Sequence, residues 1–127
     1  MITSGIDHIA LTVPDLDAQV ERLTTAFGLH LEHRVGDFAL VRDPATGVTV
    51  ELGRSDDDGV HFRHFGFRAD VDQAHQHLVD AGMQTSEPPH RRDFAGMYTS
   101  FLRQPGCAEV QLVAYDAPSA PVVDGGR

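Results

Sequence analysis

Alternation of apolar and polar residues is clearest near the start of the chain, over residues 6–13. The odd positions from Ile9 to Val13 are apolar, whereas the even positions are less so and include His8. A period of two is typical of a strand that packs one face on a core. The pattern therefore predicts a strand whose less apolar face carries His8.

A helix is predicted directly after this strand. Pro14 stops the strand, Asp15 can cap a helix, and Gly28 can end it. Apolar residues recur in between at steps of four, three and four, which predicts a buried stripe formed by Leu16, Val20, Leu23 and Phe27.

Residues 29–53 are richer in β-forming side chains. Turn signals at 36–37 and 43–47 divide this stretch into three predicted strands. The last of them, residues 48–52, alternates again and has Glu51 on its polar face. Glu51 is thus expected on the polar face of its strand, as His8 is on the less apolar face of the first strand.

The second half of the chain repeats the plan of the first. The stretch 60–72, VHFRHFGFRADVD, can be laid over 5–17, GIDHIALTVPDLD, so that His64 falls on His8. Phe65 and Phe67 then take the core-facing positions. A repeat of about 55 residues in a short chain indicates two copies of one unit, neither of which can bury its sheet face alone.

The second unit should also place a helix after its first strand. Asp70 can cap this helix and Gly82 can end it, and the predicted buried stripe is Val71, Ala74, Leu78 and Ala81. Its histidines are expected to be solvated, as are those of the neighbouring loops and strand starts: His61, His75, His77 and His90.

The remaining strands of the second unit are less evident. A loop rich in Pro and Arg, residues 87–93, should lead into strands at 97–103 and 108–113. The final strand has apolar residues on one parity, which leaves Glu109 and Gln111 together on the opposite face.

These elements predict an α+β fold of two βαβββ modules. Joined side by side, the modules would form a curved eight-stranded mixed sheet around a cavity, with the helices outside. We expect one compact domain overall, with a first module at 1–54, a linker at 55–59, a second module at 60–115 and a disordered tail at 116–127.

Composition narrows the range of functions. The chain has 127 residues, 41% of them hydrophobic, and its 10 basic against 19 acidic residues give a net charge of −9. This charge has the wrong sign for nucleic acid or an anionic membrane surface. The single cysteine excludes an internal disulfide framework, and no secretory leader precedes the first strand, so we expect a cytoplasmic protein.

The polar faces of four predicted strands would line the cavity and supply its chemistry. These faces carry His8, Glu51, His64 and either Gln111 or Glu109. Two imidazoles with oxygen donors and no thiolate suit one divalent ion with open water positions, so Fe, Ni, Co, Mn and Zn all fit. A cavity that binds its ligand without metal is the alternative.

Four motifs carry a resemblance to a known superfamily. They are DHIALTV around His8, VTVELG around Glu51, HFGFRADVD around His64 and QPGCAEVQLV near the end. With the paired βαβββ pattern, they make the chain similar to the vicinal oxygen chelate superfamily. This superfamily includes glyoxalase I, methylmalonyl-CoA epimerase, extradiol dioxygenases and the bleomycin and fosfomycin resistance proteins.

The resemblance implies metal ligands at the first and last strands of each module. His8, Glu51 and His64 match the family motifs directly, and the alignment of the final turn places Gln111 rather than Glu109 at the fourth position. This departs from the usual carboxylate. The resemblance also implies a cavity that holds a small molecule, and frequent partner exchange in the family leads us to expect a homodimer.

The first functional hypothesis is a metal-dependent lyase or isomerase of the glyoxalase or epimerase kind. Glu51, as ligand and base, and Glu109, as second base, are the candidate catalytic residues. Arg68 could pair with an anionic substrate group or equally with a nearby carboxylate. Tyr98 could contact substrate or simply pack. The alternatives are an extradiol-type dioxygenase and a drug-binding resistance protein without turnover.

Overall fold

The structure is a computed structural model that describes residues 2–116. The predicted tail at 116–127 lies outside the described residues except for Asp116. The described chain divides into two compact units, residues 8–63 and residues 2–7 with 64–116. We call them the N-terminal unit and the C-terminal unit.

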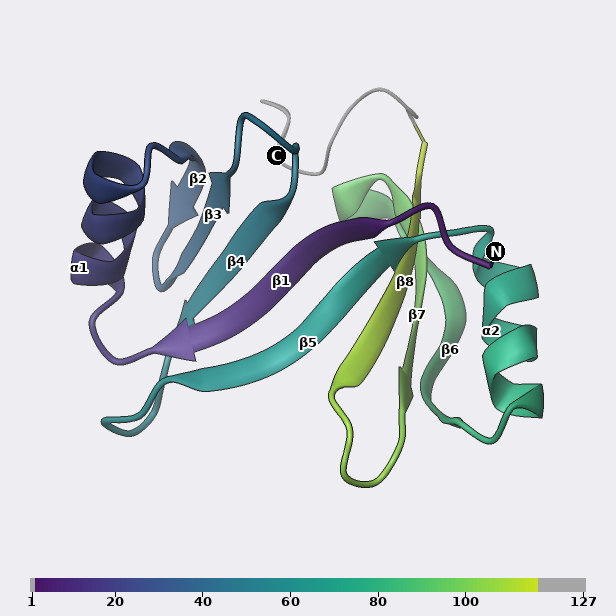
Figure 1. The fold of residues 1–127 in the computed structure, drawn as a ribbon. Helices are drawn as coiled ribbons and strands as arrows, with labels where there is room; N and C mark the ends of the chain where they lie inside the picture. The colour runs from purple at the N-terminus through teal and green to yellow at the C-terminus, as the bar shows by residue number, and fades with distance from the viewer. Residues whose placement is uncertain (1, 117–127) are drawn as a thin grey trace. The chain divides into compact units, whose positions relative to one another are not determined.

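The N-terminal unit has the order β2-β3-β4-β1 in its strands (Figure 1). β1 runs parallel to β4, and the other neighbours are antiparallel. Its elements are β1 (Ile6–Val13), α1 (Leu16–Glu21), a π-helical turn (Arg22–Ala26), β2 (His30–Val35), β3 (Phe38–Arg42) and β4 (Thr49–Arg54).

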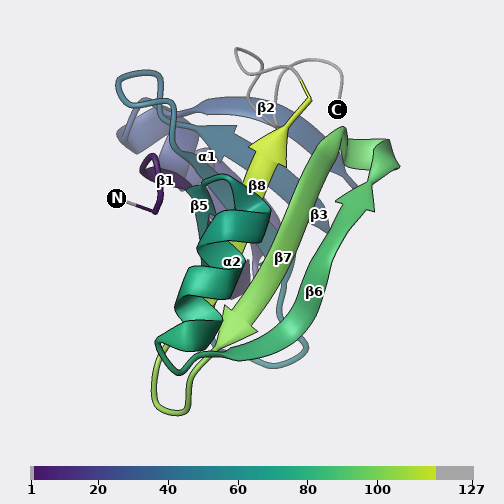
Figure 2. The ribbon, with the colours of Figure 1, turned by 90° about the vertical axis from the view of Figure 1, so that its right-hand side faces the viewer.

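The C-terminal unit repeats this arrangement with the order β5-β8-β7-β6. β5 and β8 are parallel, and α2 packs on one face of the sheet (Figure 2). Its elements are β5 (His61–Arg68), α2 (Val71–Asp80), β6 (Gln84–Arg92), a 3-10 turn (Asp93–Ala95), β7 (Met97–Arg103) and β8 (Glu109–Tyr115).

The predicted α+β class and the eight strands with mixed pairing are therefore confirmed. The exact bounds of the two modules and of the linker stay a prediction. No helix in the described part of the chain is long and apolar enough to cross a membrane.

Each unit has its own hydrophobic core between its helix and its sheet. In the N-terminal unit, the core consists of Val13, Leu16, Val20, Ala39, Val41 and Leu52. In the C-terminal unit, it consists of Val71, Ala74, Leu102 and Leu112. Each fully buried Leu or Val contributes about 1.5–3 kcal/mol through loss of apolar surface from water. The opposite face of each sheet carries the predicted metal ligands, whereas Tyr98 packs on the helix side of the C-terminal sheet.

The first helix follows the prediction only up to its last turn. Asp15 caps it by accepting a hydrogen bond from the backbone N–H of Ala18 at 3.0 Å. The turn at Arg22–Ala26 is then widened, and the hydroxyl of Thr25 bonds back to the carbonyl of Glu21. A π-turn rotates the following residues relative to an α-helix. Phe27 is therefore 68% exposed, and its prediction as a core residue was wrong.

The predicted loop at 87–93 was also wrong, because β6 extends through Arg92. β6 pairs with β7 through two register irregularities, and the second of them, between Glu87 and His90, contains Pro88 and Pro89. Bulges of this kind disturb the two-residue period from which a strand is recognised in a sequence. The prolines and the shifted register together made this strand look like a loop.

Two predictions on the second helix need correction. His75 was expected to be solvated, but it is only 7% exposed. Its Nδ1 lies 2.8 Å from the hydroxyl of Ser100 and its Nε2 lies 2.9 Å from that of Thr85. Ala81, expected in the buried stripe, is exposed because the helix ends at Asp80 and Ala81 is its C-cap. His75 therefore links α2 to two strands.

Candidate functional site

His8 and Glu51 meet in the N-terminal unit. Parallel pairing of β1 with β4 places His8 opposite Thr49. Glu51 follows Thr49 by two residues and therefore lies on the same face of the strand. His8 Nε2 lies 3.4 Å from Glu51 Oε2, and the two side chains are 2% and 23% exposed. The structure thus brings together the two predicted ligands of this unit.

The separation of these two atoms fits a shared ion. Nitrogen and oxygen ligands at about 2.1 Å from a divalent ion lie about 3.0 Å apart in octahedral geometry and about 3.4 Å apart in tetrahedral geometry. The donor set, an imidazole and a carboxylate, is also one that divalent transition metals use. This pair therefore fits a metal ion without rearrangement.

The candidate ligands of the C-terminal unit lie at strand positions equivalent to those of the N-terminal unit. His64 pairs with Glu109 and Gly66 pairs with Gln111. In the N-terminal unit, His8 pairs with Thr49 and Ala10 pairs with Glu51. Counted from each histidine, Gln111 is the equivalent of Glu51, and Glu109 is the equivalent of Thr49.

Gln111 is held at a defined orientation. It is 3% exposed, and its side-chain Nε2 donates to the Thr99 hydroxyl at 2.9 Å. The same hydroxyl donates its proton to the backbone carbonyl of Leu112 at 2.7 Å. Because a hydroxyl has only one proton, it can only accept from Gln111. The amide nitrogen therefore faces Thr99, and the amide oxygen points away from it.

His64 and Glu109 each have a defined neighbour in the same unit. The ring of His64 meets the ring of Phe101 edge to face, with a centroid separation of 5.4 Å. The carboxylate of Glu109 accepts a hydrogen bond from the Ser86 hydroxyl at 2.9 Å. Ser86 lies on β6, a strand that the βαβββ plan required but whose bounds could not be read from the sequence. These contacts orient both side chains on the face opposite α2.

Arg68 makes an internal contact with a buried carboxylate. Its Nε donates to Asp7 Oδ1 at 2.9 Å, and the Tyr115 hydroxyl donates to the other oxygen of Asp7. Asp7 is 3% exposed, so the guanidinium compensates a charge that burial would otherwise penalise. A substrate contact for Arg68 stays a prediction.

Tyr98 contacts the second helix. Its hydroxyl donates to Asp72 Oδ1 at 2.7 Å, at the start of α2. This hydrogen bond to Asp72 raises the pKa of the Tyr98 phenol, because the nearby carboxylate disfavours a phenolate. Tyr98 also packs against the core of the C-terminal unit. Its role in substrate binding is likewise still a prediction.

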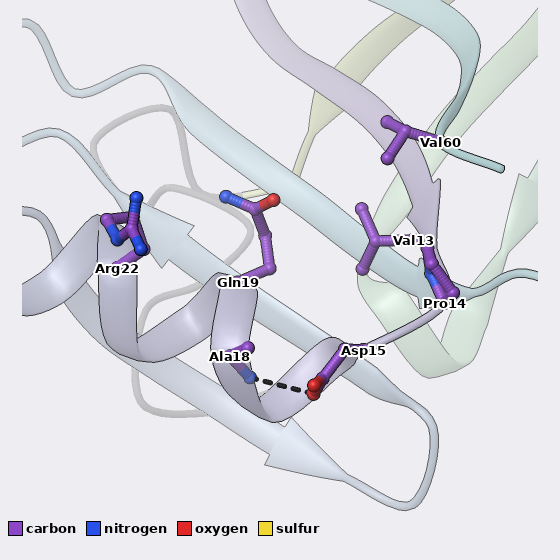
Figure 3. A pocket seen from close by; sticks show the side chains of 7 residues that line it. All are labelled: Val13, Pro14, Asp15, Ala18, Gln19, Arg22 and Val60. Carbon is purple, nitrogen blue, oxygen red and sulfur yellow. Dashed lines mark hydrogen bonds between the residues drawn. The ribbon is translucent and has the colours of Figure 1, made fainter. Parts of the chain in front are cut away.

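A pocket of the N-terminal unit lies apart from these residues. Its volume is about 270 Å³, and its wall includes Val13, Pro14, Asp15, Gln19, Arg22 and Val60 (Figure 3). The Asp15 carboxylate in this wall already accepts the capping hydrogen bond of α1 from the Ala18 N–H. None of the predicted site residues lines this pocket, so the sequence-based site and this pocket are distinct.

Several solved structures share the fold of this chain. The methylmalonyl-CoA epimerase from Mycobacterium tuberculosis has 22% sequence identity and a TM-score of 0.75, with 90% of this chain and 89% of that chain covered. The Streptomyces coelicolor epimerase in complex with 2-nitronate-propionyl-CoA has 26% identity and a TM-score of 0.71, with 92% and 100% covered. No functionally curated protein matches the chain.

The family comparison covers most of the sequence. Residues 5–112 match the family model described as the Glyoxalase/Bleomycin resistance protein/Dioxygenase superfamily. The matched segment contains both histidines, Glu51 and Gln111. The chain belongs to this superfamily, the vicinal oxygen chelate group that its sequence motifs resemble.

Proposed function

We propose that this protein is a divalent-metal-dependent isomerase or lyase that moves a carbon-bound proton of a small oxygen-chelating substrate. The observation that carries the proposal is the contact between the buried imidazole of His8 and the carboxylate of Glu51 at 3.4 Å. Two ligands of one metal ion are expected to lie this close together. The partial exposure of the Glu51 carboxylate would also leave such an ion accessible to a substrate. The superfamily and the epimerase neighbours support the same reading.

Four residues are proposed to hold the ion. His8, Glu51 and His64 form a set of two imidazoles and one carboxylate that could bind a metal. Gln111 is the fourth, since its register position is equivalent to that of Glu51. With a neutral fourth ligand, a divalent site keeps one net positive charge. That excess makes the ion a stronger Lewis acid and lowers the pKa of groups bound to it.

A bound metal ion would polarise a substrate oxygen and stabilise negative charge that develops there. The protein's carboxylates would move the proton. Glu51 is the first candidate base, and Glu109, oriented by Ser86, is the second. Neighbouring positions on one strand face lie about 7 Å apart, so Glu109 and Gln111 can serve different ends of a small substrate.

The epimerase hypothesis suggests the most clearly defined substrate to test. One of the similar structures, with 25% identity and a TM-score of 0.72, is a methylmalonyl-CoA epimerase in complex with methylmalonyl-CoA and NH4+. An α-proton next to a thioester carbonyl is the type of proton that a metal-assisted base removes. We therefore propose an acyl thioester as the first substrate to test.

Two alternatives remain as outcomes of the test. An extradiol dioxygenase would use two histidines and one carboxylate on iron, and His8, His64 and Glu51 could supply them. A resistance protein would bind a drug without turnover. A homodimer and a cytoplasmic location stay predictions that do not affect this choice.

The test begins with metal analysis of protein purified without chelator or nickel affinity resin. The protein, loaded with the metal found, is then incubated with methylmalonyl-CoA in D2O, and exchange of the α-proton is followed by NMR. We expect about one divalent ion per chain and metal-dependent exchange. Oxygen uptake with catechols under iron, together with no exchange, would instead support the dioxygenase.

A further inference from the structure

Arg92 lies on the same face of the C-terminal unit as the proposed ligands. Its guanidinium carbon is 5.3 Å from the centroid of the Phe101 ring and lies over the face of that ring. The His64 ring contacts the same aromatic ring, at 5.4 Å. Phe101 is also the register partner of Gln111. One aromatic side chain is thus the common neighbour of a cation and two proposed ligands.

The guanidinium is oriented by two polar contacts. His90 Nδ1 lies 2.8 Å from the carbonyl of Pro88, which can only accept, so Nδ1 carries a proton. His90 Nε2 accepts from Arg92 Nε at 3.3 Å and also lies 3.5 Å from Glu87 Oε1. On the other side, an Nη of Arg92 donates to Glu87 Oε1 at 3.3 Å.

These contacts leave part of the guanidinium for a ligand. Arg92 has five N–H donors, and its contacts within the described residues engage two of them. Its side chain is 29% exposed, and the Glu87 side chain that accompanies it is 48% exposed. A half-buried guanidinium over an aromatic face and with a long, single contact to a carboxylate is suited to bidentate binding of a second anion.

We infer that Arg92 binds a carboxylate on the reacting end of the substrate, so that this site selects acyl groups that carry an acid. The inference rests on the proposed function, from which it takes an acyl thioester as the class of substrate. Arg92 takes a role for which the sequence offered Arg68 as a candidate, and the Nε of Arg68 donates to buried Asp7. Arg92 and His64 contact the same Phe101 ring, so we expect the cation to meet the acyl group rather than the far end of a long thioester.

The test is equilibrium binding to metal-free protein, measured by calorimetry for wild type, Arg92→Met and Arg92→Lys. Three probes are used: methylmalonyl-CoA, propionyl-CoA and the methylmalonyl thioester of N-acetylcysteamine, which lacks phosphates. Arg92→Met should weaken both carboxylated probes about tenfold, the usual size of one lost charge-assisted contact. Propionyl-CoA should bind unchanged. Arg92→Lys should fall between wild type and Arg92→Met.

Two further variants control for charge and for structure. Arg91→Met removes the same charge one residue away, at a side chain that pairs with Asp93 and Asp116, and should leave all three affinities unchanged. Glu87→Gln removes the carboxylate partner of Arg92. If Arg92 only fastened β6 through Glu87, Glu87→Gln would weaken binding as Arg92→Met does. We expect it to leave binding intact or to tighten it.

Three results would overturn the inference. The first is that Arg92→Met lowers the affinities for propionyl-CoA and methylmalonyl-CoA equally, which would assign Arg92 to a phosphate. The second is that Arg92→Met leaves the affinities for all three probes unchanged. The third is that the wild type binds no carboxylated probe, with or without metal. The proposed function can fail separately. Arg92-dependent binding without α-proton exchange under any divalent ion would reject the isomerase and keep the carboxylate site.

Discussion

The Thr99 hydroxyl accepts a hydrogen bond from the side-chain amide of Gln111 at 2.9 Å and donates its own proton to the Leu112 carbonyl at 2.7 Å. Thr99 is fully buried, so water does not compete for either bond. An amide ligand differs from a carboxylate in that only one of its two ends can coordinate a cation. Thr99 decides which end that is, and it therefore acts as a positioning residue for the proposed metal site.

Replacement of Thr99 tests this role. Thr99→Val keeps the shape but removes the acceptor, so the Gln111 amide can turn its nitrogen toward the ion. We expect metal affinity, measured by competition with a chelator, to fall by about tenfold or more. The loss of a buried partner should also destabilise the protein by about 1–3 kcal/mol. Thr99→Ser should restore the affinity. Equal affinity in Thr99→Val would show that Gln111 is not a ligand.

A second prediction separates Gln111 from Glu109. Gln111→Glu should tighten metal binding on the order of tenfold and slow proton exchange, because it cancels the remaining charge of the site. Glu109→Gln should leave the metal content intact and also slow exchange. Chelator competition and α-proton exchange measure the two effects. Metal loss in Glu109→Gln, with metal retained in Gln111→Ala, would make Glu109 the fourth ligand.

The histidines supply a third prediction. His8→Ala and His64→Ala should each abolish stoichiometric metal binding, because two nitrogen ligands are needed to hold the ion in the proposed site. Elemental analysis after purification without nickel resin measures it. His77→Ala is the matched control, since His77 is an exposed residue on α2. Full metal content in His64→Ala would place the site elsewhere.

The buried His75 leads to a pH-dependent stability. Burial lowers the pKa of its imidazole below the ordinary value of 6.5, so the folded protein favours the neutral ring. The stability that this ring provides is present above pH 6.5 and is lost as the pH falls from 6.5 toward the lower pKa of the folded state, because the unfolded chain binds the proton first.

Urea unfolding of the metal-free protein at pH 7.5, 6.5 and 5.5 measures this loss. The free energy of unfolding should decrease across the series, and His75→Gln should flatten the dependence. His75→Gln should also reduce stability at pH 7.5 by about 1 kcal/mol or more, since Gln cannot reproduce both contacts to the Ser100 and Thr85 hydroxyls. An equally steep pH dependence in the variant would assign the effect to other groups.

The sequence was most informative where local patterns act alone. The caps Asp15 and Asp70 and the strand turns are fixed by nearby residues, and the structure has them where the sequence predicted them. The equivalence of Gln111 with Glu51 was also readable, because the repeat transfers the register of one module to the other.

Other features depend on contacts that no local pattern contains. The engagement of Arg68 by Asp7 joins residues 61 positions apart, and the sequence left open whether Arg68 pairs with substrate or with a nearby carboxylate. Arg92 was missed because the bulges of β6 hide which of its residues share a face. The contacts of His75 depend on two hydroxyls, one on the next strand, β6, and one on β7. The exposure of Phe27 depends on a π-turn, for which Thr24 and Thr25 were a faint signal.

The prolines of β6 have a consequence for self-association. β6 is the last strand in the order of the C-terminal unit, and an outer strand with regular main-chain donors can recruit a strand from another molecule. Pro88 and Pro89 are consecutive and lack N–H groups, so this edge has a gap in its donors whichever way the strand faces. The gap therefore disfavours pairing of β6 with a strand of a second copy of the chain.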